Sequence, residues 1–216
     1  MNNCTLIIDG NWLLMSRMSI MMKEFNINNS DEELKFKQRK LSDLLAQSIH
    51  KVTTTLGEVI DNIILVRDYG SWRKELETPY DDIDYKGTRE RDEQTSWPHI
   101  FGALDLVAEK IETYGGSVTM NYLIEGDDWC WQWSTKLNDN NINCIIWSTD
   151  ADLKQLVRYR KNAWTCWYNE INGLVYPVEQ LSTIDLFMQP IRTCDHYLSV
   201  LKRIVPKNNP MESCNI

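Results

Sequence analysis

Four short apolar segments, each followed within a few residues by acidic side chains, constrain the fold of this chain most strongly. They lie at residues 5–8, 63–67, 117–122 and 142–148. Short apolar runs of this kind are typical of buried β-strands. Longer amphipathic segments separate them, and this alternation predicts an α/β fold with a mainly parallel central sheet flanked by helices.

The segments between and after the predicted strands indicate the other elements. We expect helices at residues 34–56, 100–114, 127–137, 152–159 and 178–188. Residues 70–98 are crowded with charge and lack an apolar period, so we expect a loop or short helices that project from the sheet. In residues 164–176, aromatic and apolar side chains flank Asn172-Gly173, a dipeptide that favours a hairpin turn.

The acidic residues stand where the predicted strands end. Because the carboxyl ends of parallel strands meet at one edge of a sheet, where ligands bind, we expect these side chains to converge. The third group lies between the third strand and the next helix. The converging acids are Asp9 and Asp68 after the first two strands, Glu125, Asp127 and Asp128 after the third, and Asp150 and Asp152 after the fourth.

Such a cluster predicts a metal site. Carboxylates packed together repel and raise each other's pKa values, so cations are needed to neutralise them. Oxygen ligands without His or Cys favour Mg²⁺ or Mn²⁺ over zinc, and the chain has only three histidines. The alternative is that the acids are helix N-caps, which Asp commonly provides after a strand. A single acid fits the cap better, whereas four such strand ends favour metal.

Composition limits the class of protein. With 43% hydrophobic and 25% charged residues, the chain matches a globular domain. The absence of a membrane-spanning stretch or a signal peptide leads us to expect a cytoplasmic protein. Six scattered cysteines without CxxC pairs indicate free thiols. The net charge of −8 opposes nucleic-acid binding in general, but metal offsets clustered carboxylates and phosphate contacts need only local basic patches.

The same residues carry a resemblance to a known family. The first half of the chain resembles phage and bacterial 5′-nucleases through Leu6-Ile7-Ile8-Asp9-Gly10-Asn11, Arg67-Asp68 and Tyr85-Lys86-Gly87-Thr88-Arg89. Two later acidic motifs of that family are matched by Glu125-Gly126-Asp127-Asp128 and Ser148-Thr149-Asp150-Ala151-Asp152. Within the flap-endonuclease family, the ribonuclease H branch of T-even phages is most similar, through Trp72-Arg73-Lys74 and Thr95-Ser96-Trp97.

The resemblance implies a PIN-like catalytic domain over residues 1–178, with a charged arch at about 70–98 over the active site. Residues 179–216 would be a helical remnant and a frayed tail, without a recognisable helix-hairpin-helix region. Such a domain would use magnesium, or manganese in its place, to trim DNA 5′ ends or flaps and to remove RNA primers from RNA–DNA hybrids. Two ions are expected once substrate is bound.

Individual roles follow from the resemblance. Asp9, Asp68, Glu125, Asp127 and Asp128 would surround the first ion, and Asp150 and Asp152 the second. Lys86 and Arg89 would stabilise phosphate charge as it develops, although their spacing alone favours a solvated charged face. We expect nucleic-acid contacts from Trp72, Arg73, Lys74 and Arg91.

Two assignments remain open in the second half of the chain. Arg158, Arg160 and Lys161 would either contact a duplex backbone or complement a helix C-terminus. The nearest match to the family's last metal-binding carboxylates is Asp195, with Leu198 in place of the second acid.

Three other functions remain open on the sequence. A PIN-type ribonuclease would share the acids and cut single-stranded RNA. A catalytically weak relative would bind branched nucleic acid or a replication protein, and a structural domain would use the acids only as caps. As a 5′-nuclease, the chain would be a monomer that meets single-strand-binding or clamp proteins in the cytoplasm, of a bacterial host if phage-encoded.

Overall fold

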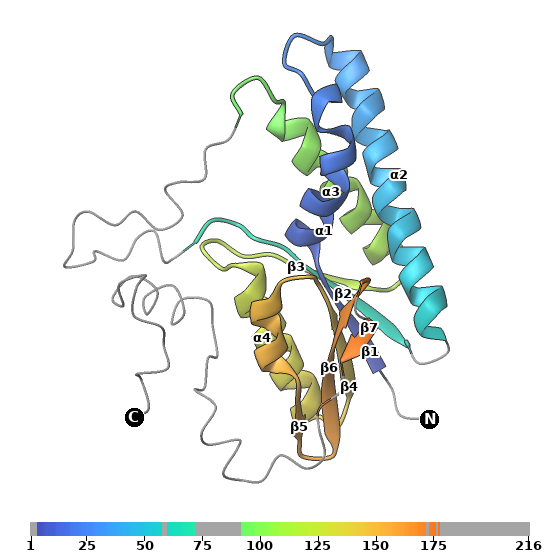
Figure 1. The fold of residues 1–216 in the computed structure, drawn as a ribbon, viewed down its shortest axis with the longest axis vertical. Coiled ribbons are helices and arrows are strands. Elements are labelled where there is room, and N and C mark those ends of the chain that lie inside the picture. The colour runs from blue at the N-terminus through green and yellow to red at the C-terminus, as the bar shows by residue number, and fades with distance from the viewer. Residues whose placement is uncertain (1–3, 58–59, 72–91, 172, 176, 178–216) are drawn as a thin grey trace, which may run out of the picture.

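A mainly parallel sheet forms the centre of the computed structural model, which describes residues 4–57, 60–71, 92–171, 173–175 and 177. Its parallel strands run in the order β3-β2-β1-β4-β6, and β5 and β7 pair antiparallel with β6. This arrangement confirms the predicted α/β class (Figure 1). The strands are β1 (Cys4–Asp9), β2 (Asn62–Val66), β3 (Ser117–Thr119), β4 (Asn143–Trp147), β5 (Arg158–Arg160), β6 (Ala163–Asn169) and β7 (Gly173–Val175).

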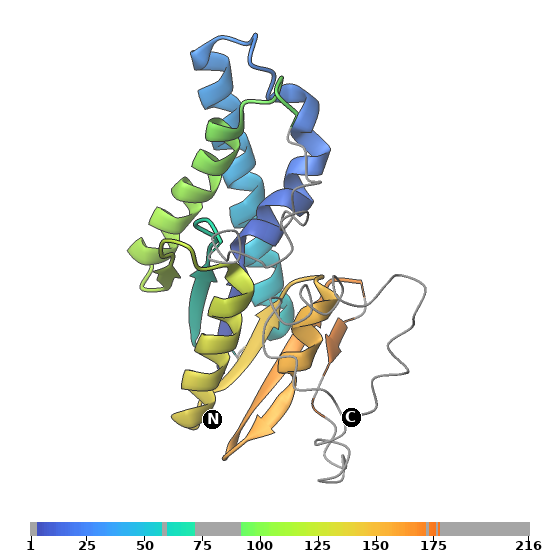
Figure 2. The ribbon, with the colours of Figure 1, turned by 90° about the vertical axis from the view of Figure 1, so that its left-hand side faces the viewer.

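Helices cover both faces of the sheet. Three long helices pack together over one face and extend beyond it, and a fourth covers the other face (Figures 1 and 2). The first group is α1 (Gly10–Met21), α2 (Asp31–Leu56) and α3 (Trp97–Thr113), with the short η1 (Met22–Glu24) after α1. The opposite face carries α4 (Gly126–Asp139) and η4 (Ala151–Leu156).

The central strand β1 is buried on both sides. Leu6 and Ile8 join the apolar cluster under α1, α2 and α3. Ile7 joins the second cluster, with Cys130 of α4 and Ile146 of β4. Successive residues of a strand point to opposite faces, so an unbroken apolar run is what a strand between two helical layers requires.

Three predicted helices are confirmed, with small shifts of their ends. The helix expected at residues 34–56 begins earlier, at Asp31, because Ser30 forms a capping box with Glu33. The Ser30 hydroxyl accepts the Glu33 N–H at 3.3 Å, and the Glu33 carboxylate accepts the Ser30 N–H at 3.1 Å. The helices expected at residues 100–114 and 127–137 are α3 and α4.

One helix was not predicted. In α1, the exposed positions Met15 and Ile20 are apolar, as are the buried positions Leu13, Leu14 and Met18. An amphipathic pattern depends on contrast between faces, and this segment has almost none. Only the packing of α1 against the sheet and α2 identifies its inner side.

The helix predicted at residues 152–159 is wrong. A 3₁₀ helix ends at Leu156, and the chain then forms β5, where Arg158 pairs with Thr165 of β6. Lys161 takes a positive φ of 54° in the turn between the two strands. Pairing with β6 satisfies the backbone groups that a longer helix would have used.

The predicted hairpin is confirmed in the residues that the structure describes. Asn169 of β6 pairs with Gly173 of β7, and Gly173 adopts a φ of 76° that glycine tolerates well. The expected strand 117–122 is shorter and ends at Thr119. Most of the arch predicted at residues 70–98, and the helix predicted at 178–188, lie outside the described residues.

Two further expectations concern thiols and membranes. Cys4, Cys130, Cys144 and Cys166 are free and buried, as the sequence predicts. Burial raises the pKa of the Cys4 thiol to about 12 and that of Cys144 to about 11. Across the described ranges, no helix has both the length and the apolar character needed to span a bilayer.

Candidate active site

Asp9 ends β1 and is 6% exposed. One carboxylate oxygen, Oδ1, accepts the N–H of Trp12 at 3.0 Å and so caps α1. The other, Oδ2, accepts the Ser148 hydroxyl at 3.1 Å. The register that pairs Ile8 with Trp147 places Asp9 opposite Ser148 on the neighbouring strand. Both oxygens of the buried carboxylate are therefore fixed.

Asp68 follows β2, on the other side of β1. Its Oδ1 accepts the backbone N–H of Gly126, the first residue of α4, at 2.5 Å. The N–H of Asp68 in turn donates to the side-chain oxygen of Asn11 at 3.3 Å. A carboxylate at a helix N-terminus is stabilised by free N–H groups and by the helix dipole. Asp68 thus joins the end of β2 to the start of α4.

Gly126 shows how closely two of the acids approach one another. A Cβ atom added there would lie 2.9 Å from Oδ1 of Asp68 and 3.6 Å from Oδ1 of Asp9. The two carboxylates therefore face the same small space in front of the first turn of α4.

Asp150 follows β4 and completes the row of strand ends. Its Oδ1 accepts the N–H of Asp152 at 2.9 Å, and its own N–H donates to the Ser148 hydroxyl at 3.1 Å. Ser148 is fully buried and bridges Asp9 to Asp150. Ser148 was not among the predicted site residues. The signal for it was its position at the end of the fourth predicted strand, just before the acids.

The electrostatics of the site are dominated by Asp9. Burial is the largest cause that raises the pKa of this carboxyl from 3.8 to about 7, and the negative charges of Asp68 and Asp150 contribute to the same rise. Hydrogen bonds from Trp12 and Ser148 act in the opposite direction. This is the change that clustered carboxylates predict, and it means that the metal-free site disfavours a charged Asp9 at neutral pH.

The other predicted acids lie on or just before the two elements that adjoin this centre, α4 and η4. Glu125 is buried just before α4, and Asp127 and Asp128 lie in its first turn. Burial, then the charges of Asp9, Asp127 and Asp68, raise the pKa of the Cys130 thiol, so all three acids act on this residue of α4. Asp152 lies in η4.

The acids meet at one edge without enclosing an ion. Within the ranges that the structure describes, no three His, Cys, Asp or Glu side chains form a group that could hold a metal as they stand. The carboxyl ends of β2, β1 and β4 are nevertheless adjacent, and each contributes one acid.

The cap and metal interpretations are not exclusive. Asp9 caps α1 and Asp150 caps η4, as the alternative interpretation proposed. Asp68 accepts the N–H of Gly126, the first residue of α4, although Asp68 itself follows β2. Capping uses one oxygen of each carboxylate and holds the side chains at the sheet edge.

Several predicted site residues lie outside the described residues. These are Trp72, Arg73, Lys74, Lys86, Arg89 and Arg91, all within 72–91, together with Asp195.

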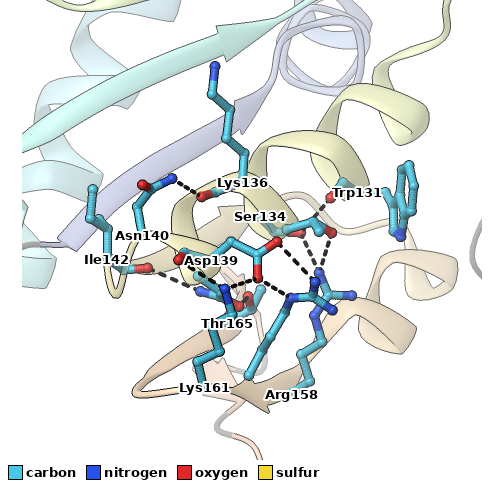
Figure 3. A network of polar contacts seen from close by, with 12 residues as sticks. Trp131, Ser134, Lys136, Asp139, Asn140, Ile142, Arg158, Lys161 and Thr165 are labelled. Atoms are coloured by element: carbon cyan, nitrogen blue, oxygen red, sulfur yellow. Dashed lines mark hydrogen bonds and ion pairs between the residues drawn. The ribbon is translucent and has the colours of Figure 1, made fainter.

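Lys161 complements a helix C-terminus, as one of the two interpretations proposed, but the helix is α4 and not the one predicted at residues 152–159 (Figure 3). The basic residues lie on β5 and its turn, and Lys161 Nζ donates to the carbonyl of Asp139, the last residue of α4, at 3.3 Å. Arg160 donates two bonds of 2.9 Å to Asp139 of α4, and Lys161 lies 3.0 Å from the same carboxylate. Hydrogen bonds from Arg160 and Lys161 lower the pKa of Asp139 to about 2.

Arg158 adds to this link between β5 and α4. Its guanidinium donates to the hydroxyls of Ser134 at 3.3 Å and Thr135 at 2.7 Å. Asp139 offsets the neighbouring charges that a duplex contact would use. The basic residues therefore join β5 to α4. Figure 3 shows Arg158 and Lys161 beside Asp139 at the end of that helix.

The parallel sheet, its two helical layers and the acids at the carboxyl edge together define an α/β fold with an acidic site. No known family profile matches the chain, and no curated protein matches it in sequence. Solved structures do match. A bacteriophage T5 protein co-crystallised with metal ions superposes with a TM-score of 0.57 at 13% identity, over 80% of this chain and 58% of that one.

Two further T5 structures agree. The T5 flap endonuclease in a pseudo-enzyme–product complex with DNA and metal ions gives a TM-score of 0.54 at 17% identity, over 80% of this chain and 57% of that one. The T5 5′-exonuclease with bound zinc gives a TM-score of 0.53 at 16% identity, over 82% of this chain and 59% of that one. This chain thus spans less than two thirds of those proteins, and at these identities the likeness establishes the fold.

Proposed function

We propose that this chain is a metal-dependent 5′-nuclease that hydrolyses phosphodiester bonds at DNA 5′ ends or flaps and in the RNA primers of RNA–DNA hybrids. One observation carries the proposal. Asp9, Asp68 and Asp150 stand at three adjacent strand ends, with Ser148 and the start of α4 holding them in place. We place this activity in DNA replication or repair, in the cytoplasm.

The donors at this edge fit a hard divalent cation. They are oxygen atoms, and the negative charges of Asp68 and Asp150 act on Asp9 to raise its pKa, an effect that a bound cation would oppose. Magnesium keeps several waters and uses one or two protein carboxylates together with substrate phosphates. It does not require three protein ligands in contact, so the open arrangement of these acids suits it. Manganese favours the same donors and would substitute.

Each acid has a proposed task. Asp9 and Asp68, with Glu125, Asp127 and Asp128, hold the first ion directly or through water. Asp150 and Asp152 hold the second, which binds together with substrate. When bound, such ions lower the pKa of water and stabilise the attacking and leaving oxygens of an in-line displacement at phosphorus. Lys86 and Arg89 balance the phosphate charge.

The fold likeness supports DNA as a substrate, since one T5 neighbour is a flap endonuclease complex with DNA and metal ions. We infer contacts from Trp72, Arg73, Lys74 and Arg91 to the nucleic-acid strand. The protein would act as a monomer alongside single-strand-binding or clamp proteins.

A cleavage assay tests the proposal. The pure chain is incubated with a 5′-labelled flap duplex, an RNA–DNA hybrid and a matching single strand, each with magnesium or with EDTA. Asp43→Asn provides a matched control, because Asp43 lies on α2 and pairs with Lys110 away from the acids. We expect magnesium-dependent cleavage of the flap and hybrid by wild type and Asp43→Asn, and none by Asp68→Asn.

Other outcomes point to other functions. Cleavage restricted to single-stranded RNA would indicate a PIN-type ribonuclease. Tight flap binding without cleavage would indicate a binding protein. Neither binding nor stabilisation by magnesium would leave the acids as helix caps alone.

A further inference from the structure

Two tyrosines lie exposed beside the acidic edge. Tyr69 directly follows Asp68, and Tyr122 lies in the loop between β3 and α4. They are 54% and 64% exposed, and their rings meet edge to face with centroids 5.9 Å apart and planes at 66°. Single exposed aromatic residues are ordinary on protein surfaces. An ordered pair next to a candidate active site calls for a physical explanation.

The backbone fixes the two loops to one another. The N–H of Leu123 donates to the carbonyl of Tyr69 at 2.6 Å, and the N–H of Tyr69 donates to the carbonyl of Ile124 at 3.3 Å. Figures 1 and 2 show the loop after β2 running beside the loop before α4. Ring contact and main-chain bonds therefore both hold Tyr69 against Tyr122.

The same loops contain unusual backbone conformations. Leu123 has a φ of 63°, in the left-handed region that bulky residues rarely occupy. Gly70 has a φ of 82°, and a Cβ atom there would meet the Leu123 side chain at 3.4 Å. Residues in such conformations persist where their surroundings hold them, and they cluster at ligand sites. Local energetics alone would not give Leu123, the residue after Tyr122, this conformation.

We propose that Tyr69 and Tyr122 form a stacking platform for an unpaired base of the nucleic-acid substrate, a proposal that rests on the nuclease function above. Aromatic side chains stack on any base, because every base has a π-face. Consecutive Cα atoms lie about 3.8 Å apart, so Tyr69 stands next to Asp68, within reach of a nucleotide that neighbours the phosphate to be cleaved. The pair thus gives the acidic edge the aromatic contact that its carboxylates cannot supply.

The platform would select for unpaired nucleotides without reading their sequence. A base inside a duplex is already stacked on its neighbours, whereas a base in a flap or a frayed end is open to an aromatic ring. The contact would therefore favour 5′ flaps and ends over continuous duplex.

The test compares binding of two flap substrates in EDTA, where metal-dependent cleavage is blocked. One carries a fluorescent adenine analogue in the flap, and the other has an abasic residue at that position. The variants are Tyr69→Ala, Tyr122→Ala and both Tyr→Phe forms. The matched control is Tyr114→Ala, which removes an 89% exposed tyrosine at the far end of α3.

We expect wild type, both Phe variants and Tyr114→Ala to bind the base-containing flap about tenfold or more tightly than the abasic one. Both Ala variants should lose this preference, and only proteins with both aromatic rings should quench the fluorescent base. A purely structural tyrosine pair would change the melting temperature without changing this ratio. If an Ala variant fails to fold, Tyr122→Leu keeps the bulk of the side chain and removes the π-face.

Two results would overturn the platform: equal affinity of wild type for the two flaps, or a preference that survives in both Ala variants. A parallel cleavage assay with magnesium separates this failure from failure of the nuclease proposal. Cleavage by wild type without a base preference would remove the platform alone. A base preference without cleavage would remove the nuclease assignment and leave the platform.

Discussion

Replacing Asp9 with Asn should remove the pH dependence of stability that this residue gives to the metal-free protein. In the folded state, burial and the neighbouring Asp68 and Asp150 raise the pKa of Asp9 from 3.8 to about 7. Between these values the folded protein binds a proton that the unfolded chain has released. Stability contributed by the protonated carboxyl is therefore complete below pH 3.8 and is lost as the pH rises to about 7.

The size of this effect follows from the same values. A pKa that rises from 3.8 to about 7 corresponds to about 4 kcal/mol of lost stability, as an order of magnitude. The Asn side chain keeps the shape of Asp and cannot ionise. The Asn oxygen can accept the Trp12 N–H, while the Asn amide group faces Ser148. A poorer hydrogen bond to Ser148 therefore offsets part of the stability that the variant gains by not ionising.

Urea unfolding in EDTA at about pH 5 and about pH 8 measures the difference. Wild type should lose markedly more stability than Asp9→Asn over this interval, so that the variant is the more stable protein at the higher pH. Asp43→Asn controls for loss of an exposed carboxylate and should follow wild type. Magnesium should restore wild type at the higher pH and leave Asp9→Asn unchanged. Parallel pH profiles for wild type and Asp9→Asn would refute the reasoning.

Three other predictions concern the same site. Asp68→Asn and Asp150→Asn should each abolish cleavage of a labelled flap while circular dichroism stays unchanged, and near-normal turnover would remove that residue from the site. Lys86→Ala should lower the single-turnover cleavage rate far more than the affinity for the flap, because a cation that meets developing charge acts on the transition state. Equal losses of rate and affinity would mean that Lys86 only contacts a phosphate. Ser148→Ala should cost about 1–3 kcal/mol in urea unfolding, because the buried Asp9 oxygen loses its donor, and an unchanged midpoint would contradict that role.

Much of the fold was readable from local sequence. Short apolar runs identified β1, β2 and β4, since a strand buried on both faces needs apolar residues at every position. The acids after these runs could be assigned to one edge, because parallel strands end on the same side. The capping pair Ser30 and Glu33 and the turn glycine Gly173 also act through neighbours close in sequence.

Other features could not be read in this way. The α1 helix carries apolar residues on its exposed side as well as its buried side, so no periodicity marked it. β5 forms because Arg158 to Arg160 find partners on β6, which a local pattern cannot reveal. The charges of Arg160 and Lys161 fitted either a phosphate contact or a helix C-terminus, and no local pattern showed that Asp139 at the end of α4 lies beside them.

The sequence by itself determined which segments form buried strands and which acidic residues stand at their ends, because apolar runs and the residues that follow them are properties of short segments. The tertiary structure alone decided how those ends combine. Placing β1 between β2 and β4 brings Ser148 to Asp9 across 139 positions and Gly126 to Asp68 across 58. Strand order and such long-range hydrogen bonds depend on the packing of the whole domain, so they set the pKa of Asp9 and the positions of the acids where no local pattern could.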